Sequence, residues 1–402
     1  MNILQICNKF PYPLKDGGVI AAFSMLKGFY VTGHDVTVLT INTSKHYTNV
    51  DDIPYEVGQM ADFHQVYKNT HVSFLGALWN LCFSQIPYTA SRFMFSKFKN
   101  KLKQVLSQNK FEVIQIEGLY MCAYIPFIRK FSDAQIVYRA HNVEYEIWDR
   151  LWRETKNPVK KCYIKTLAKR VERFERKYIN MYDLLVPITQ RDADKYYEMG
   201  NVKPYFVAPT GVFVEEMNVV KKDVVSSLFH IGGLDWAPNQ QGLVWFLHEC
   251  WPRIHAKYPQ LRCSLAGRNA PEWFVREMNV PGVEFVGEVP DAKDFMMAQD
   301  IMVVPLMAGS GMRIKIIEGM AYGKTIVSTT VGAEGIPAKS GAEIVIANNA
   351  DEFVEKISDL VDNPDKVYDI AKNARTFVRQ KFDNYSIIQE LVDFYFRYVF
   401  RN

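Results

Sequence analysis

The chain has 402 residues, which is more than one hydrophobic core usually supports, so two domains are expected. Hydrophobic residues make up 48% of the sequence and aromatic residues 14%, a composition that excludes a disordered or fibrous protein. The 48 basic and 44 acidic residues leave a formal charge of +4, so no strong overall field predicts a nucleic acid as partner.

The cysteines and the apolar segments indicate where in the cell the protein is located. Six cysteines are scattered without a Cys-x-x-Cys pair, which predicts free thiols in a reducing environment. The first residues lack the charged start and the apolar stretch of an export signal. The most apolar segment, residues 72–83, is shorter than the ~20 residues that a bilayer crossing needs. We therefore expect a cytoplasmic protein, soluble or peripheral at the inner face of the membrane.

The first half of the chain alternates between strand-like and helical patterns. Residues 3–7 predict a strand, 19–32 a helix and 35–41 a second strand. Further strands are expected at residues 112–117, 134–139, 184–188 and 205–208. This alternation predicts a mostly parallel sheet with helices on both faces.

A second alternating set follows a charged, weakly patterned stretch beyond Gly211. It opens with a strand over residues 227–232 and a helix from 238 to about 257. Further strands are expected at residues 262–266, 283–286, 301–305, 325–328 and 343–346. The last segment is an apolar helix pattern crowded with aromatic side chains, which needs a surface to pack on. The pattern as a whole predicts an α/β fold of two Rossmann-like domains.

The strongest chemical signal is a glycine turn between the strand 301–305 and an apolar helix. Gly309 and Gly311, with Ser310 and Met312 in the same turn, let the backbone approach a ligand at the carboxyl end of a strand, where such sheets bind ligands. The helix start that follows favours anions.

Three charged residues follow this turn. Arg313 and Lys315 add two cations suited to a diphosphate, whereas Glu318, one helical turn deeper, suits the hydroxyls of a ribose. The alternative is a structural helix start with a surface Arg and Lys.

At this point the sequence resembles glycosyltransferase family 4, a family of the two-domain GT-B fold. The helix and strand that end the family's donor signature read here Glu-Gly-Met-Ala-Tyr-Gly-Lys-Thr-Ile-Val over residues 318–327. Further matches cover nearly the whole chain: the opening Pro-x-Pro and glycine loop and residues 140–144, 209–212 and 235–239.

The resemblance implies two Rossmann-like domains that face each other across a cleft. Residues 1–211 would form the acceptor domain and residues 226–384 the nucleotide-sugar donor domain. Residues 385–402 would form a helix that crosses back to the N-terminal domain.

Two departures from the family pattern concern the donor site. Many members carry two glutamates with seven residues between them; here Ser310 takes the first position and Glu318 the second. Many also hold the diphosphate with an Arg and a Lys near the start of the second domain, and this chain has neither there. The sequence is similar to a branch with Gly-x-Gly-x-Arg-x-Lys, which implies that Arg313 and Lys315 supply the missing charge.

In the first domain, Gly17 and Gly18 precede a helix and would present backbone N–H groups, where the family meets the donor phosphate and the acceptor. A plain strand-to-helix turn explains the pair equally well. His141 follows a strand, and the resemblance places a histidine near the transferred sugar; a buried histidine bonded to backbone is the alternative. Glu117 and Glu144 are nearby carboxylate candidates.

Two further features have competing interpretations. Asp192-Ala193-Asp194 looks like a metal clasp, but its position at a helix start explains the acids, so no metal and no cofactor beyond the donor substrate is expected. Residues 152–177 hold ten basic and three acidic residues and could lie against anionic lipid as a peripheral membrane contact. A solvated helix packed through Tyr163, Leu167 and Val171 is the alternative.

The sequence therefore predicts a hexosyltransferase-like glycosyltransferase. It would move a sugar from a nucleotide diphosphate donor to a glycan, lipid-linked or small-molecule acceptor, with retained configuration and without metal, in bacterial-type surface polysaccharide or glycoconjugate synthesis. The alternatives are a non-catalytic nucleotide-binding or scaffold protein of GT-B type, motivated by Ser310, and a nucleotide-sugar epimerase.

Overall fold

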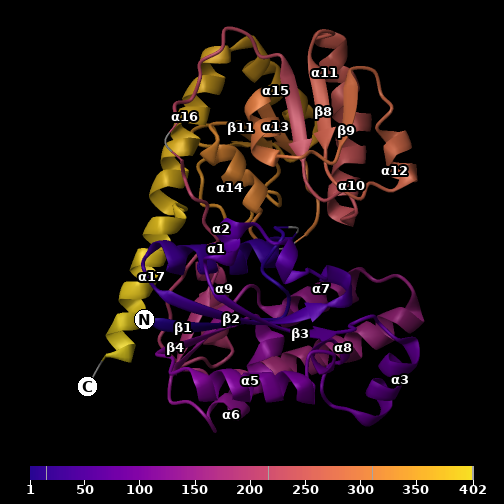
Figure 1. Ribbon diagram of the computed structural model, residues 1–402. Coiled ribbons are helices and arrows are strands. Elements are labelled where there is room, and N and C mark those ends of the chain that lie inside the picture. The colour runs from indigo at the N-terminus through magenta and orange to yellow at the C-terminus, as the bar shows by residue number, and fades with distance from the viewer. Residues whose placement is uncertain (15, 216, 310, 401–402) are drawn as a thin grey trace. The chain divides into compact units, whose positions relative to one another are not determined.

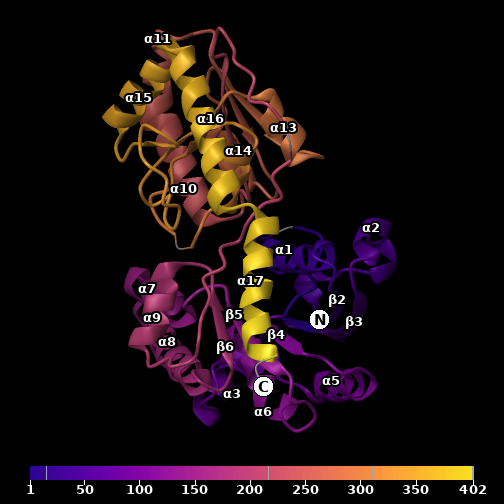
Figure 2. The ribbon, with the colours of Figure 1, turned by 90° about the vertical axis from the view of Figure 1, so that its left-hand side faces the viewer.

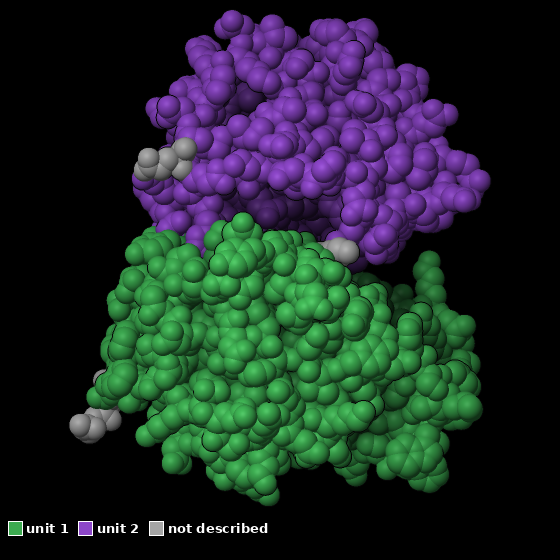
Figure 3. Space-filling model, in the orientation of Figure 1, with its two compact units in different colours: residues 1–210, 384–402 green, residues 211–383 purple. Residues whose placement is uncertain are grey.

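The computed structural model describes residues 1–14, 16–215, 217–309 and 311–400 (Figure 1). The chain divides into two compact units, coloured separately in Figure 3. Unit 1 comprises Met1–Thr210 and Asn384–Asn402, and unit 2 comprises Gly211–Asp383. Each unit is built on a parallel six-stranded sheet, which confirms the expected α/β fold of two Rossmann-like domains.

The sheet of unit 1 has the order β3-β2-β1-β4-β5-β6. Its strands are β1 (Asn2–Cys7), β2 (Asp35–Thr43), β3 (Asp62–Lys68), β4 (Val113–Glu117), β5 (Gln135–Ala140) and β6 (Leu184–Pro187). The chain reverses direction across the sheet between β1 and β4, and sheets of this type bind ligands beyond the carboxyl ends of the strands at that point.

The observed sheet differs from the sequence prediction in two places. Strand β3 was missed because polar residues interrupt its apolar pattern at a half-buried sheet edge. The strand expected at residues 205–208 is absent from the described structure, where Tyr205 forms only an isolated bridge to Leu185. Hydrogen bonds to β6 hold this segment alongside the sheet without the length of a strand.

Helices cover both faces of the first sheet. The longer ones are α1 (Gly17–Val31), α3 (Phe74–Phe83), α5 (Ser96–Gln108), α7 (Glu144–Glu154), α8 (Pro158–Tyr178), α9 (Gln190–Glu198) and α17 (Asn384–Val399). Shorter helical segments are η1 (Ser44–His46), η2 (Val50–Asp52), α2 (Tyr55–Gly58), α4 (Tyr88–Ser91), η3 (Leu119–Tyr124) and α6 (Ile125–Ile128).

The alternating side chains of the strands divide the core of unit 1 into two layers. Leu4 and Ile6 of β1 belong to the apolar cluster that also contains residues of α5 and α8, whereas Ile3 belongs to the cluster of α1 and α17. Helix α17 lies along α1 (Figure 2) and buries Ile388 and Leu391 there. The aromatic C-terminal helix thus packs on the first unit although it follows the second in sequence.

Unit 2 repeats this topology. Its sheet order is β12-β11-β10-β7-β8-β9, so the reversal point lies between β7 and β10. The strands are β7 (Ser227–Ile231), β8 (Arg262–Ala266), β9 (Val283–Gly287), β10 (Ile301–Val304), β11 (Thr325–Ser328) and β12 (Val345–Ile346). The helices are α10 (Ala237–Trp245), the π-turn η4 (Phe246–Cys250), α11 (Trp251–Lys257), α12 (Glu272–Glu277), α13 (Ala292–Ala298), α14 (Ile314–Ala321), α15 (Ala350–Asp362) and α16 (Pro364–Lys381).

The close packing of α1 on α17 generates a stability prediction. A Cβ atom at Gly28 would lie 2.3 Å from Ile388 Cγ1, so Gly28→Ala forces the two helices apart. We expect a loss of about 1–3 kcal/mol in the free energy of unfolding, since overpacking outweighs the helix propensity that alanine gains. Chemical denaturation of the variant measures this loss.

Gly17→Ala is the matched control, because no atom lies within 4 Å of a Cβ at that position of the same helix. In an Ile388→Ala background, Gly28→Ala should cost much less, as expected of residues in direct contact. Equal stability of Gly28→Ala and the parent protein would contradict the packing described.

Candidate functional site

In unit 1 the loops after β1, β4 and β5 bring the predicted residues Gly18 and His141 together with Glu117. His141 Nε2 lies 2.6 Å from Glu117 Oε2. A Cβ atom on Gly18 would lie 3.7 Å from His141 Nδ1, so the glycine turn lies beside the Nδ1 edge of the imidazole, opposite Glu117. The group lies at the carboxyl edge of the sheet, beside the reversal point.

Glu117 is the buried anchor of this group. Its Oε1 accepts hydrogen bonds from Gln5 at 2.7 Å and Gln115 at 2.5 Å, and Tyr395 of α17 donates to Gln115 Oε1 at 2.7 Å. Burial alone raises the pKa of Glu117, but its hydrogen bonds and the nearby cationic groups hold that pKa below the ordinary value. The carboxylate therefore accepts the Nε2–H of His141 and leaves Nδ1 toward the glycine turn.

The helix start at Gly17 and Gly18 already has an anionic partner. Asp16 Oδ1 accepts hydrogen bonds from the amides of Gly18 and Val19 at 3.0 and 3.1 Å, and Lys9 Nζ lies 2.9 Å from Asp16 Oδ2. Burial raises the pKa of Asp16, but Lys9, the Val19 amide and His46 together keep that pKa below its ordinary value. A ligand phosphate at this turn would compete with Asp16, a residue that the sequence analysis missed.

Glu144, the other carboxylate candidate, begins α7 close to this group. Its Oε2 accepts a hydrogen bond from Tyr120 at 3.2 Å, and burial raises the pKa of Glu144 above the ordinary value. Glu175 of α8 accepts hydrogen bonds from the amides of Glu144 and Tyr145 and thus caps α7. Glu144 is therefore fixed in position at the edge of the group.

In unit 2 the glycine turn adopts a backbone that only glycine favours. Gly309 has φ of +123° and Gly311 of +85°. A Cβ atom on Gly309 would lie 2.6 Å from Arg313 Nη2 and 3.0 Å from Trp236 Cη2, so a side chain there would displace both neighbours. Ser310 lies outside the described residues.

Arg313 immediately precedes α14 and is buried. Its Nη1 donates a hydrogen bond to the Gly311 carbonyl, and its guanidinium carbon lies 5.3 Å from the centroid of the Trp236 ring. Met312 is half-buried and packs on the apolar cluster that includes Ile316 and Ile317 of α14. The turn therefore holds the Arg313 guanidinium in one orientation.

Lys315 reaches from α14 to the loop that follows β7. Its Nζ lies 3.0 Å from His230 Nε2 and donates a hydrogen bond to Asn239 Oδ1 at 3.0 Å. A Cβ atom on Gly232 would lie 3.0 Å from the same Nζ. The predicted cation thus lies against Gly232, the first glycine after β7, at the reversal point between β7 and β10.

His230 fixes the position of this lysine. Its Nδ1 lies 2.8 Å from the Val303 carbonyl, so Nδ1 carries the proton and Nε2 accepts from Lys315. Burial and the charge of Lys315 hold the pKa of His230 well below its ordinary value, which keeps the ring neutral. His230 and Asn239 were missed as site residues because their partner Lys315 is 85 and 76 residues away in sequence.

Lys315 and Glu318 carry opposite charges, and the surroundings move both of their pKa values to about 7. Burial, with the nearby charge of Arg313, lowers the pKa of Lys315 to about 7. Burial raises the pKa of Glu318 to about 7, and no described side chain donates a hydrogen bond to its carboxylate. Among the described residues, Lys315 therefore has no anionic partner, and the Glu318 carboxylate has no hydroxyl group that donates to it.

Two further sequence features take structural positions. Asp192 and Asp194 lie at the start of α9, where Asp192 Oδ1 accepts from Arg191 at 3.1 Å and Asp194 Oδ1 from Gln190 at 2.8 Å. The basic stretch at residues 152–177 spans the end of α7 and most of α8, whose Leu167 and Val171 are buried in the core.

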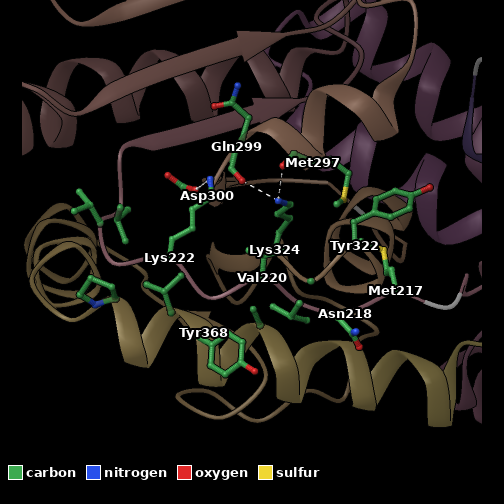
Figure 4. Close-up of a pocket in the computed structure, with 17 residues that line it drawn as sticks. Met217, Asn218, Val220, Lys222, Met297, Gln299, Asp300, Tyr322, Lys324 and Tyr368 are labelled. Atoms are coloured by element: carbon green, nitrogen blue, oxygen red, sulfur yellow. Dashed lines mark hydrogen bonds and ion pairs between the residues drawn. The ribbon is translucent and has the colours of Figure 1, made fainter.

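Unit 2 also contains a cavity of about 190 Å³, which is lined neither by the glycine turn nor by Lys315 (Figure 4). Its lining includes Asp300 and Lys324, which immediately precede β10 and β11, so it sits at the amino edge of the sheet. Lys324 Nζ donates to the carbonyls of Met297 and Gln299 at 3.1 and 2.8 Å, and burial lowers the pKa of Lys324 to about 8. The predicted donor residues lie at the opposite, carboxyl edge.

Comparison with known proteins agrees with this architecture. Residues 226–363 match the family model of the glycosyl transferases group 1. A relative from Klebsiella pneumoniae, described as an uncharacterized 44.6 kDa protein in the cps region, is 22% identical over 404 residues, covering 97% of this chain and 98% of the relative.

Two solved structures are similar over nearly their whole length. Anabaena Alr3699/HepE in complex with UDP is 15% identical with a TM-score of 0.67, covering 98% of this chain and 99% of that one. Sucrose-phosphate synthase from Thermosynechococcus elongatus is 16% identical with a TM-score of 0.71, and 99% of each chain is covered.

Among the described residues, no helix is long and apolar enough to cross a membrane. The solved structures show that the chain has the GT-B fold, and the match of residues 226–363 to the glycosyl transferases group 1 supports glycosyl transfer as its chemistry.

Proposed function

We propose that the protein is a hexosyltransferase-like enzyme of glycosyltransferase family 4, in the branch with the Gly-x-Gly-x-Arg-x-Lys donor motif. It moves a sugar from a nucleotide diphosphate donor to a glycan, lipid-linked or small-molecule acceptor, without metal and with retained configuration. The observation that carries the proposal is the position of Lys315 Nζ against the Gly232 turn, held by His230 and Asn239. The UDP bound to Anabaena Alr3699/HepE supports uracil as the base of the donor.

The relative in the cps region supports a place in surface polysaccharide or glycoconjugate synthesis. We propose a cytoplasmic location, which the six free cysteines support because such thiols suit a reducing compartment. No described disulfide links these cysteines.

The proposed phosphate clamp replaces charge that other family members carry on the loop after the first strand of the donor domain. Lys315 brings its ammonium to that loop from α14, and Arg313 adds a guanidinium already oriented by Gly311 and Trp236. Charge that develops on the leaving diphosphate would meet cations that need no rearrangement. The desolvated Lys315 gains most from such a partner, because its burial without an anion disfavours its charge.

The other groups take the parts of the donor that carry hydroxyls. The Glu318 carboxylate accepts two hydrogen bonds from the ribose diol, and these offset the desolvation that raises its pKa. His141 is the candidate for contact with the transferred sugar, and Glu117 is a positioning residue that fixes the tautomer and orientation of His141.

A panel of nucleotide sugars, scored by thermal shift and then by donor turnover, tests the proposed activity. We expect one donor to stabilise the protein, to be hydrolysed slowly and to be transferred when an acceptor is supplied. Binding without turnover would favour a non-catalytic protein, and conversion of the donor into its epimer would favour an epimerase.

Removal of the phosphate clamp should abolish activity. We expect Arg313→Ala with Lys315→Ala to lower donor hydrolysis and transfer by about 10³-fold or more, because two charge-assisted contacts to the leaving group are lost. Initial rates with the selected donor measure this loss. The control is Arg276→Ala with Lys339→Ala, which removes the same charge from exposed positions of unit 2. Activity of the first variant within a few-fold of the parent protein would sink the assignment.

Donor affinity should be greatest near neutral pH. Below about pH 7 Glu318 becomes protonated and loses its acceptor charge, and above about pH 7 Lys315 loses its proton, so affinity should fall on both sides, approaching about tenfold per pH unit. Calorimetric titration of the nucleotide sugar across this range measures the profile.

Two variants separate the limbs of this profile. Glu318→Gln, which cannot titrate, should flatten the acid limb, and Lys315→Arg, which keeps its charge, should flatten the alkaline limb. A profile that neither variant changes would contradict the roles given to both residues.

Loss of the Glu117 carboxylate should affect turnover more than donor binding. We expect Glu117→Gln to lower kcat by about 10–100-fold with a small change in the donor KM, because His141 loses its oriented tautomer. Tyr395→Phe, which removes only the outermost hydrogen bond to Gln115, is the milder control. Equal kcat values for Glu117→Gln and the parent protein would show that His141 acts without this support.

A further inference from the structure

Helix α3 of unit 1 exposes apolar side chains and buries a polar one, the reverse of an ordinary surface helix. Its buried residue is the polar Asn80, whereas its large apolar side chains face outward. Phe74 is 80% exposed, Leu75 75%, Trp79 65% and Phe83 74%. A helix that only had to cover the core would bury these side chains and expose the asparagine.

Polar contacts fix α3 in this orientation. Asn80 Nδ2 donates to the Ile86 carbonyl at 3.1 Å, and the Ser73 hydroxyl accepts from the Gly76 amide and caps the helix. Arg170 of α8 donates to the carbonyls of Asn80 and Leu81 at 3.1 and 2.7 Å. The buried side of α3 is thus bonded to α8, and its apolar side is left outward.

The contact with α8 places the apolar surface beside a basic one. Lys165, Lys169 and Arg173 follow one another at intervals of four residues along the exposed side of α8, and Arg170 lies within the same stretch. Lys165 lies 5.0 Å from the Trp152 ring centroid, and across the described residues neither Lys169 nor Arg173 forms an ion pair. Figures 1 and 2 show α3 beside α8 at the periphery of unit 1.

We propose that the outward face of α3, with the basic stripe Lys165, Lys169 and Arg173 of α8, docks unit 1 on a bilayer that contains anionic lipids. The ten residues of α3 extend about 15 Å, so the helix would lie in the headgroup region rather than span the membrane. Its aromatic side chains suit the interface, and the stripe meets lipid phosphates.

The charges favour a lipid surface over a second copy of the chain. In a two-fold symmetric dimer through α3, the same patch meets itself, so the basic stripes of α8 would be brought toward each other. An anionic bilayer instead offers opposite charge beside an apolar layer. The surface does not involve the donor site, so its test is independent of the proposed activity.

Vesicle co-sedimentation of the full chain tests the docking surface. We expect binding to vesicles of phosphatidylcholine with phosphatidylglycerol, and a loss of roughly 30-fold or more in Leu75→Ser/Trp79→Ser/Phe83→Ser. Lys165→Ala/Lys169→Ala/Arg173→Ala should lose about fivefold per charge on the same vesicles and little on pure phosphatidylcholine. High salt should erase the difference between the basic variant and the parent protein.

The matched control is Tyr55→Ser/Tyr197→Ser/Val202→Ser, which removes three comparably exposed apolar side chains from the same unit. This variant should bind vesicles like the parent protein. Absence of vesicle binding, equal losses in the control and the α3 variant, or lipid-free dimers that the α3 substitutions dissolve would each overturn the proposal.

A direct probe of insertion uses the cysteines. Cys82 lies in α3 and is exposed, as is Cys162 in α8, whereas the other four cysteines are buried. In a Cys162→Ser variant, an environment-sensitive fluorophore on Cys82 should shift to shorter wavelength on anionic vesicles. An unshifted spectrum from vesicle-bound protein would contradict insertion of α3.

Discussion

The parallel pairing of the first and fourth strands of each unit determines where the candidate site residues come together. Because β1 lies beside β4 and β7 beside β10, the loops that leave their carboxyl ends lie together although they are far apart in sequence. The glycine turns and Lys315 belong to such loops or to the helix starts that follow them, and His141 directly follows β5, the neighbour of β4. With another strand order, the residues of each candidate site would lie on turns that are far apart.

Burial then gives these residues their chemical character. Glu117 is buried with enough hydrogen-bond donors to keep its pKa low, whereas Glu318 is half-buried without them and desolvation raises its pKa to about 7. Lys315 is likewise half-buried and lies against a neutral histidine rather than an anion. Unit 1 therefore contains a hydrogen-bonded network that orients His141, whereas among the described residues of unit 2 Lys315 and Glu318 have no ionic partner, which the proposed donor would supply.

Local patterns in the sequence predicted most of the fold, because buried parallel strands are continuous apolar runs between helices. The prediction failed at sheet edges, where β3 is only half-buried and Tyr205 pairs through a single bridge. In the site, Gly309, Gly311 and Arg313 could be predicted because they act within one turn. The partnership of Lys315 with His230 could not, since 85 residues separate them and only the strand order brings them together.

The place of α17 also affects how the chain folds during synthesis. This helix completes the core of unit 1, yet the ribosome makes it after all of unit 2. At roughly 5–20 residues per second, the groove on α1 and the side chain of Gln115 wait on the order of ten seconds or more for their partners. Over that interval unit 1 is an incomplete domain with an uncovered apolar face, and its polar network closes only once α17 has been made.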